Sequence, residues 1–489
     1  MRKTFFTLLA AVMATVAQGK VWMPAVFGDG MVLQRESNVK LWGTTDINKV
    51  VKVTTSWNDK TYLVKADKKG KWQVAVTTPE AGGPYDVTVS DGEDVVFSDV
   101  LIGEVWLCAG QSNMEMPMKG FPSQPIDNGN IDVLHSGDPQ LRLLTSKRTS
   151  RVEPIDTVYG KWANAVPETV REFSATAYYF GRELRRMLNV PVGLIVTAWG
   201  GSSCESWIDR EHVKDFVTAK SPYQIPYKPS DIKSPNRQPT VLFNGMLNPI
   251  IGYGIRGAIW YQGEDNIPRY QDYAQQMKTM VSLWREKWDI GEFPFFYCQI
   301  APYDYSLINW TVNSALLREQ QFMAEKEIPN SGMAVLLDAG IEYGIHPPQK
   351  NIAGERLALL ALAKTYGVKG VNAESARYKS MEVKDGSVIL SFENDKMNLY
   401  CKNSAFTSKY FEIAGEDRVF YPAKVELYKR KFLKVSSPDV PDPVAVRYAF
   451  KDWVVGDIFC DNLPISSFRT DSWPVPERVI EKEKKEYDR

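Results

Sequence analysis

Short runs in which apolar and polar residues alternate fill the first part of the chain after about residue 20. Two of them are VVKVTTSW at 50–57 and KWQVAV at 71–76, and clusters of turn-forming residues at 67–70 and 80–84 separate such runs. Alternation with a period of two is typical of strands that have one buried face. Residues 20–100 are therefore predicted to form a small antiparallel β domain.

Continuous apolar runs replace this alternation from residue 101 onward. They lie at 104–110, 192–200, 256–263, 293–301 and 332–338. Between them, apolar residues recur with helical spacing at 173–188, 270–288 and 351–367. Buried strands that alternate with helices indicate a parallel sheet covered on both faces. We expect this α/β domain to span residues 101–370.

Short strands return after about residue 370. The runs SVILSFE at 387–393, AKVELYK at 423–429 and VAVRYAF at 444–450 indicate a second β region, expected over residues 371–489. Its last residues, ERVIEKEKKEYDR, form a charged tail.

The first 19 residues have the pattern of an export signal. Arg2 and Lys3 precede an apolar stretch that is too short to span a membrane, and small residues stand at Ala17 and Gly19. We expect cleavage after Gly19 and a mature protein that is periplasmic or extracellular.

Charge and cysteine content narrow the possible partners. The 489 residues include 59 Lys+Arg and 59 Asp+Glu, so no excess charge favours nucleic acid or an anionic membrane as partner. The five cysteines are odd in number and widely spaced. This spacing does not indicate a disulfide framework or a zinc site, and buried thiols are the favoured interpretation.

Chemistry-bearing residues follow the predicted parallel strands. Ser112 follows the first strand, Gly201 the second and Gln262 the third, while Asp338 ends the fifth and His346 stands eight residues later. Ligands of an open parallel sheet bind beyond the carboxyl ends of its strands. Serine needs a base to accept its proton, and histidine is the usual base near neutral pH. This pattern predicts a serine nucleophile served by His346.

Acyl transfer also requires hydrogen-bond donors for the developing oxyanion. The backbone N–H groups of Ser112 and Gly201 are suitable, and the side-chain amide of Gln262 or Asn266 could complete the set. The alternative is that the two glycines at 200–201 form only a tight turn and that Gln262 is an ordinary satisfied polar residue.

Several segments together resemble the sialate O-acetylesterase family of SGNH-type carbohydrate esterases. They are GQSNMEM at 110–116, GGSSCESW at 200–207, WYQGEDN at 260–266 and IHPPQK at 345–350. The resemblance implies an SGNH-hydrolase-like three-layer α/β/α domain with a parallel sheet, flanked by N- and C-terminal β-sandwich-like regions. It also implies hydrolysis of acetyl esters on sugars without a metal or organic cofactor.

Carried over position by position, the resemblance makes Ser112 the nucleophile and His346 the general base and acid. It makes Ser112, Gly201 and Gln262 the oxyanion donors, with Asn266 as the alternate for the last role, and Glu264 a supporting acid. Relatives often carry an aspartate two or three residues before the histidine, where this chain has Tyr343 and Gly344.

Three explanations of this departure are open. In the first, Asp338 or Glu342 takes the place of the aspartate. In the second, a backbone carbonyl holds the histidine in a Ser–His dyad. In the third, the enzyme is degraded. The dyad is favoured, with Glu342 next.

The sequence therefore predicts a secreted serine esterase that acts on an O-acetylated sugar, either sialic acid or an acetylated polysaccharide. The alternative is a carbohydrate-binding protein on an inactive hydrolase scaffold. Neither nucleic acid binding nor membrane insertion is expected, and the sequence leaves the oligomeric state open.

Overall fold

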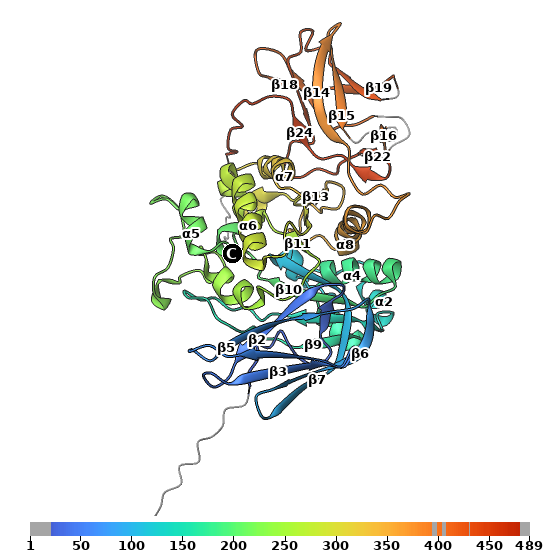
Figure 1. Cartoon of the computed structure of the whole chain (residues 1–489). Helices are drawn as coiled ribbons and strands as arrows, with labels where there is room; N and C mark the ends of the chain where they lie inside the picture. The colour runs from blue at the N-terminus through green and yellow to red at the C-terminus, as the bar shows by residue number, and fades with distance from the viewer. Residues whose placement is uncertain (1–20, 394–398, 403–406, 430, 480–489) are drawn as a thin grey trace, which may run out of the picture.

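The computed structural model describes residues 21–393, 399–402, 407–429 and 431–479. The expected export signal and the last ten residues of the charged tail lie outside these residues. Figure 1 shows strands of the N-terminal region at one end, helices and strands in the middle, and the C-terminal strands at the other end. Within the described part of the chain, no helix has the length and apolarity needed to cross a bilayer.

The middle region is built on a central sheet in the order β13-β12-β11-β7-β10-β8-β9. Its strands are β7 (Asp94–Gly110), β8 (Asp138–Thr145), β9 (Trp162–Ala165), β10 (Val192–Ala198), β11 (Gly257–Tyr261), β12 (Phe295–Cys298) and β13 (Ser331–Ala334). Neighbouring strands run parallel except β9, which is antiparallel to β8. The predicted parallel sheet is thus confirmed, and the α/β class with it.

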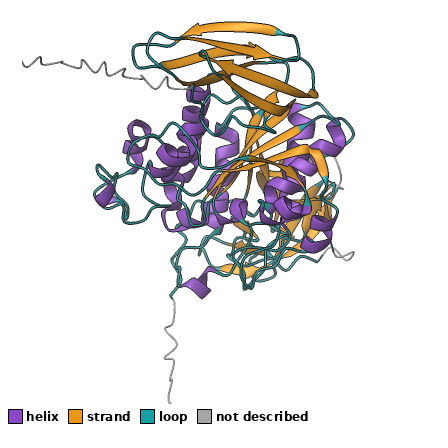
Figure 2. Ribbon diagram, turned by 90° about the horizontal axis from the view of Figure 1, so that it is seen from below, coloured by secondary structure: helices purple, strands orange, loops and turns teal. Residues whose placement is uncertain are grey.

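Helices cover both faces of this sheet, as Figure 2 shows around the central fan of strands. The helices are α1 (Ser112–Glu115), α2 (Gly129–Leu134), α3 (Pro167–Glu172), α4 (Ala175–Leu188), α5 (Arg210–Val213), α6 (Tyr273–Trp288), α7 (Ala315–Glu327) and α8 (Lys350–Leu360). Leu107 of β7 belongs to the core that contains Met277 of α6, whereas Trp106 belongs to the core that contains Phe180 of α4. Successive residues of β7 are therefore buried on opposite faces, which explains its continuous apolar run.

The three predicted helices correspond to α4, α6 and α8. Helix α4 begins where the Ser174 hydroxyl accepts a hydrogen bond from the Ala177 N–H, and it ends at Asn189 in the left-handed conformation. Helix α7 was not predicted from the sequence.

The N-terminal strands are β1 (Val32–Gln34), β2 (Asn38–Thr44), β3 (Val50–Thr55), β4 (Lys60–Lys65), β5 (Lys71–Thr77) and β6 (Gly82–Ser90). Four of them, β1, β3, β4 and β6, are joined to the central sheet through β7, whereas β2 and β5 pair with each other. The first half of β7 pairs with β6 and β1, and its second half pairs with β10 and β11. The boundary expected at residues 100/101 thus falls inside one continuous strand.

Among the described residues of the C-terminal region, the strands form three small antiparallel sheets, ordered β14-β15-β20-β19, β18-β17-β21-β24 and β16-β22-β23. They are β14 (Arg377–Lys384), β15 (Ser387–Glu393), β16 (Leu399–Cys401), β17 (Phe411–Ala414), β18 (Phe420–Pro422), β19 (Lys424–Tyr428), β20 (Phe432–Ser436), β21 (Ala445–Tyr448), β22 (Ile458–Cys460), β23 (Leu463–Pro464) and β24 (Phe468–Arg469). The fully buried Arg318 of α7 donates to the Ser467 hydroxyl at 3.0 Å. This region therefore packs against the middle one.

Candidate active site

Ser112 lies where the central strand β7 turns into the short helix α1. The strand ends at Gly110, whose φ is +145°, and a Cβ there would lie 2.2 Å from the carbonyl oxygen of Tyr261. Only glycine allows this close approach of β7 to β11 before the turn. The turn therefore places Ser112 at the carboxyl end of the sheet, where ligands of parallel sheets bind.

His346 reaches Ser112 from the loop that follows β13. Its Nε2 lies 2.7 Å from the Ser112 Oγ, although the two residues are 234 positions apart in the sequence. A neutral imidazole that accepts this hydrogen bond can take the serine proton. The structure thus brings together the two side chains that the sequence pattern paired.

Gln124 contacts the other nitrogen of the imidazole. Its Oε1 lies 2.5 Å from Nδ1 of His346, so that Nδ1–H donates to the amide oxygen and Nε2 stays free to accept. Gln124 and Phe121 exchange backbone hydrogen bonds of 2.9 and 3.0 Å across a tight turn. The Phe121 ring meets the imidazole edge to face, with 5.2 Å between centroids. A neutral amide therefore holds the histidine, for which relatives often carry an aspartate.

The surroundings of His346 favour its neutral form. Burial, together with the nearby charge of Lys350, lowers the pKa of His346 to about 4. At any pH above about 5 the ring is consequently a proton acceptor.

The Gly200–Gly201 turn lies directly against Ser112. A Cβ placed on Gly200 would be 3.2 Å from the Ser112 Cβ, and the Gly200 N–H donates to the Glu115 carboxylate at 2.8 Å. Among the backbone hydrogen bonds of the described residues, neither the Ser112 N–H nor the Gly201 N–H has an acceptor. Both N–H groups are therefore available as donors to a substrate oxygen.

The side-chain amides expected to complete the oxyanion hole are engaged elsewhere. Gln262 Nε2 donates to the Ser202 carbonyl at 2.9 Å and to Asn266 Oδ1 at 2.8 Å. Asn266 Nδ2 donates to Glu205 at 2.9 Å and to Gln276 at 3.1 Å. Because both hydrogens of each amide are already used, the expectation that Gln262 or Asn266 is an oxyanion donor is wrong for this structure. Both amides instead form hydrogen bonds with buried residues next to the site.

Three carboxylates were considered as supports for the histidine: Asp338, Glu342 and Glu264. None of them forms a hydrogen bond with the imidazole in the described structure. Asp338 forms a bidentate pair with Arg356 at 2.7 and 2.8 Å. Glu264 accepts a hydrogen bond from Asn113 at 2.5 Å. The partner of the imidazole Nδ1 is the glutamine amide. Ser112 and His346 therefore pair without a carboxylate, and only the expected acceptor at Nδ1 differs, because it is the Gln124 side chain and not a backbone carbonyl.

Comparison with known proteins finds carbohydrate esterases. Residues 102–338 match the family model for a carbohydrate esterase, the sialic acid-specific acetylesterase. The sialate O-acetylesterase of Homo sapiens is 28% identical over 462 residues, covering 86% of each chain, and that of Rattus norvegicus is 26% identical over 491 residues. A crystal structure of a carbohydrate acetylesterase from Xanthomonas citri has 33% identity and a TM-score of 0.83, covering 93% of this chain and 100% of the other.

The chain belongs to the sialate O-acetylesterase family. It is therefore a carbohydrate esterase, as its motifs predict.

The segment 205–242 of this esterase reaches the site at its far end. Asn236 Nδ2 donates to the Gly200 carbonyl at 2.7 Å, and Arg237 Nε donates to Asp265 at 2.6 Å. An Arg237 nitrogen would lie 3.2 Å from a Cβ placed on Gly201. This end of the segment therefore forms a polar wall beside the turn that carries the oxyanion donors.

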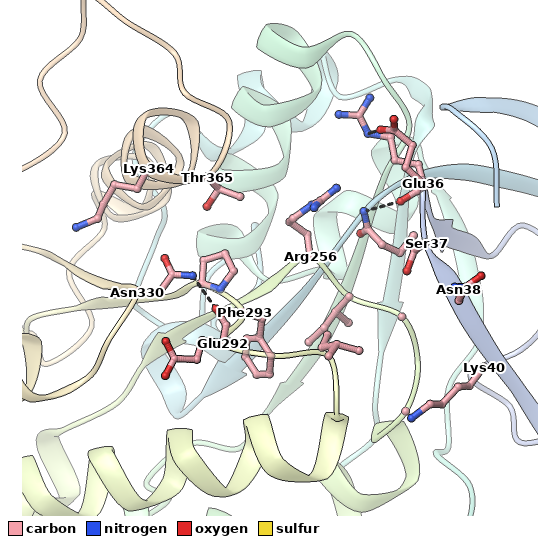
Figure 3. A pocket seen from close by; sticks show the side chains of 17 residues that line it. Glu36, Ser37, Asn38, Lys40, Arg256, Glu292, Phe293, Asn330, Lys364 and Thr365 are labelled. Atoms are coloured by element: carbon pink, nitrogen blue, oxygen red, sulfur yellow. Dashed lines mark hydrogen bonds and ion pairs between the residues drawn. The ribbon is translucent and has the colours of Figure 1, made fainter. Parts of the chain in front are cut away.

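A separate pocket of about 400 Å³ opens at the opposite end of the sheet (Figure 3). Its walls include Ser37 and Lys40 from the N-terminal strands and Arg256, just before β11. None of the residues expected in the esterase site lines it. Nowhere in the described ranges do three His, Cys, Asp or Glu side chains gather in a group suited to a metal ion.

Proposed function

We propose that this esterase removes acetyl groups from sugar hydroxyls, with Ser112 as the nucleophile and His346 as the general base and acid. The observation that carries the proposal is the 2.7 Å contact between the Ser112 Oγ and the His346 Nε2. The similarity to sialate O-acetylesterases and to a carbohydrate acetylesterase supports an acetylated sugar as the substrate.

The reaction has two halves. His346 takes the Ser112 proton as the Oγ attacks the acetyl carbonyl, and it then returns the proton to the departing sugar oxygen. An acetyl-enzyme remains. His346 next takes a proton from water, which attacks the acetyl carbon and releases acetate, and the proton returns to the Ser112 Oγ.

Two backbone groups stabilise the charge that develops on the carbonyl oxygen in both halves. These are the N–H groups of Ser112 and Gly201, which are fixed before the substrate arrives. The imidazolium that forms transiently keeps its orientation because Nδ1–H donates to Gln124.

The proposal extends to the type, location and substrate of the enzyme: an exported SGNH-type esterase that acts outside the cytoplasm on acetylated sialic acid or an acetylated polysaccharide. The N-terminal sequence pattern supports export. The alternative of an inactive binding scaffold was motivated by the missing aspartate and by the two β regions. Since Gln124 supplies a hydrogen-bond acceptor for the imidazole, the missing aspartate no longer argues for that alternative.

The test measures acetate release by the purified protein from 9-O-acetyl sialic acid and from acetylated xylan, with p-nitrophenyl acetate as the reference ester. Wild type should release acetate from at least one glycan, and Ser112→Ala should release none from any ester. Comparison of the two glycans identifies the better substrate.

Labelling with a fluorophosphonate provides the control. Wild type and Ser380→Ala, which alters an exposed serine of β14, should both be labelled, whereas Ser112→Ala should not. A Ser112→Ala variant that keeps full turnover would reject the nucleophile assignment.

A further inference from the structure

A chain of three buried polar side chains lies behind the two reacting residues. Lys350 Nζ donates to Asn113 Oδ1 at 2.8 Å, and Asn113 Nδ2 donates to Glu264 Oε1 at 2.5 Å. The exposed fractions of these residues are only 1%, 1% and 2% respectively. One amide thus links a buried amine to a buried carboxyl group.

Two of these side chains also hold the backbone on both sides of His346 by hydrogen bonds. Asn113 Nδ2 donates to the carbonyl of Ile345 at 3.2 Å, and Lys350 Nζ donates to the carbonyl of Pro347 at 2.6 Å. Because Asn113 directly follows Ser112, the same amide connects the turn of the nucleophile to the loop of the base. A shift in any of the three side chains would change the distance between Ser112 and the imidazole.

Such an arrangement is costly for stability alone. Burying charged groups carries a desolvation penalty of several kcal/mol per ion, and apolar side chains of similar volume are often no less stable. The second carboxyl oxygen of Glu264 has no hydrogen-bond partner in the described structure. The position of these groups next to the reacting pair points to a role in the reaction.

We propose that Lys350, acting through Asn113 and with Glu264, is a positioning residue that fixes the His346 loop and keeps the imidazole in its neutral, proton-accepting form. This inference rests on the proposed function, because it takes His346 as the base. It goes beyond that function by assigning the control of the base to a buried amine.

The charges around these groups determine the sign of the effect. Glu264 and the Cys298 thiol face Lys350 and raise the pKa of its amine, but burial outweighs them and lowers it to about 7. Of the groups that shift the pKa of His346, Lys350 is the charged one, and it lowers that pKa in addition to burial. A neutral amine still has two N–H donors, so the hydrogen bonds to Asn113 and Pro347 do not require the charge.

The test compares wild type with Lys350→Met, which removes both the charge and the donors. For p-nitrophenyl acetate, kcat should fall by about 10²-fold because the imidazole is misplaced, while KM should change little. The acidic limb of the kcat/KM profile should move to higher pH by about one unit, because the imidazole loses a neighbouring positive charge. Rates are normalised to the fraction that a fluorophosphonate labels.

The double variant Lys350→Met/Glu264→Gln is the control for misfolding. It leaves no unpaired buried charge, whereas the single variant leaves the Glu264 carboxylate without the Lys350 amine. The double variant should show the same shift of the acidic limb. A purely structural role would lower the labelled fraction without moving the limb, and an unmoved limb in both variants would overturn the proposal. If His346→Gln kept full activity, the proposed function itself would fail, so the two failures can be told apart.

Discussion

The Oε1 atom of Gln124 lies 2.5 Å from the Nδ1 atom of His346, on the side of the imidazole opposite Ser112. An amide oxygen selects the same tautomer as a carboxylate would, because it can only accept from Nδ1–H. It carries no charge, however, so it does not raise the pKa of the imidazole as an acid would. Gln124 therefore orients the imidazole without stabilising its charge, whereas one aspartate often does both.

Removing the amide should impair turnover. Gln124→Ala leaves Nδ1 without its acceptor, so the ring can rotate or adopt the other tautomer. We expect kcat for p-nitrophenyl acetate to fall by about 10²- to 10³-fold, somewhat less than the roughly 10⁴-fold loss known for a mis-set triad tautomer. Steady-state kinetics measure the effect. Gln124→Asn, which keeps the amide on a shorter arm, should lose less, and equal activity of Gln124→Ala and wild type would contradict the assignment.

Replacing the amide by a carboxylate should change the pH dependence. Gln124→Glu puts a negative charge beside Nδ1 and therefore raises the pKa of His346, by roughly one to three units for a close opposite charge. The acidic limb of the kcat/KM profile should move to higher pH by that amount, so activity at pH 5 should fall relative to activity at pH 8. An unchanged limb would show that position 124 does not face the base.

The oxyanion turn offers a third test. Glu115 accepts the hydrogen bond of the Gly200 N–H at 2.8 Å and also pairs with Arg148. Glu115→Ala should release the turn that carries the Gly201 donor, and we expect kcat to fall by about 10-fold or more, since a lost oxyanion donor costs about 10²- to 10³-fold. Arg148→Ala is the matched control, because it removes the ion pair and keeps the carboxylate. Equal losses in the two variants would assign the effect to the ion pair instead.

The sequence predicted the parts of the site that follow from strand topology. Continuous apolar runs placed β7, β10 and β11 in one parallel sheet, where they are neighbours. Residues that follow such strands must meet at one edge, so Ser112 and Gly201 could be placed together without coordinates. His346 was singled out because, of the three histidines, it alone stands in the loop after a predicted core strand.

The orienting residue could not be predicted in this way. Gln124 belongs to an irregular turn, its side chain is uncharged, and its contact with His346 spans 222 positions. The motif around Gln262 likewise predicted that this residue lies near the site, but it did not predict which groups its side-chain amide contacts. These contacts depend on the buried acceptors at Ser202 and Asn266, which only the packed structure reveals.

The low pKa of His346 should make stability fall in mild acid. The folded protein holds this group at a pKa of about 4, whereas an unfolded histidine has a pKa near 6.5. Between these values the unfolded chain binds the extra proton, so the free energy of unfolding decreases as the pH falls from about 6.5 to 4. The loss from this group is ~3 kcal/mol, and it is absent above about pH 7. Urea denaturation of wild type and His346→Gln at pH 4.5 and pH 7.5 isolates it, because all other groups are shared. If both proteins lost the same stability on acidification, His346 would not be the group that titrates.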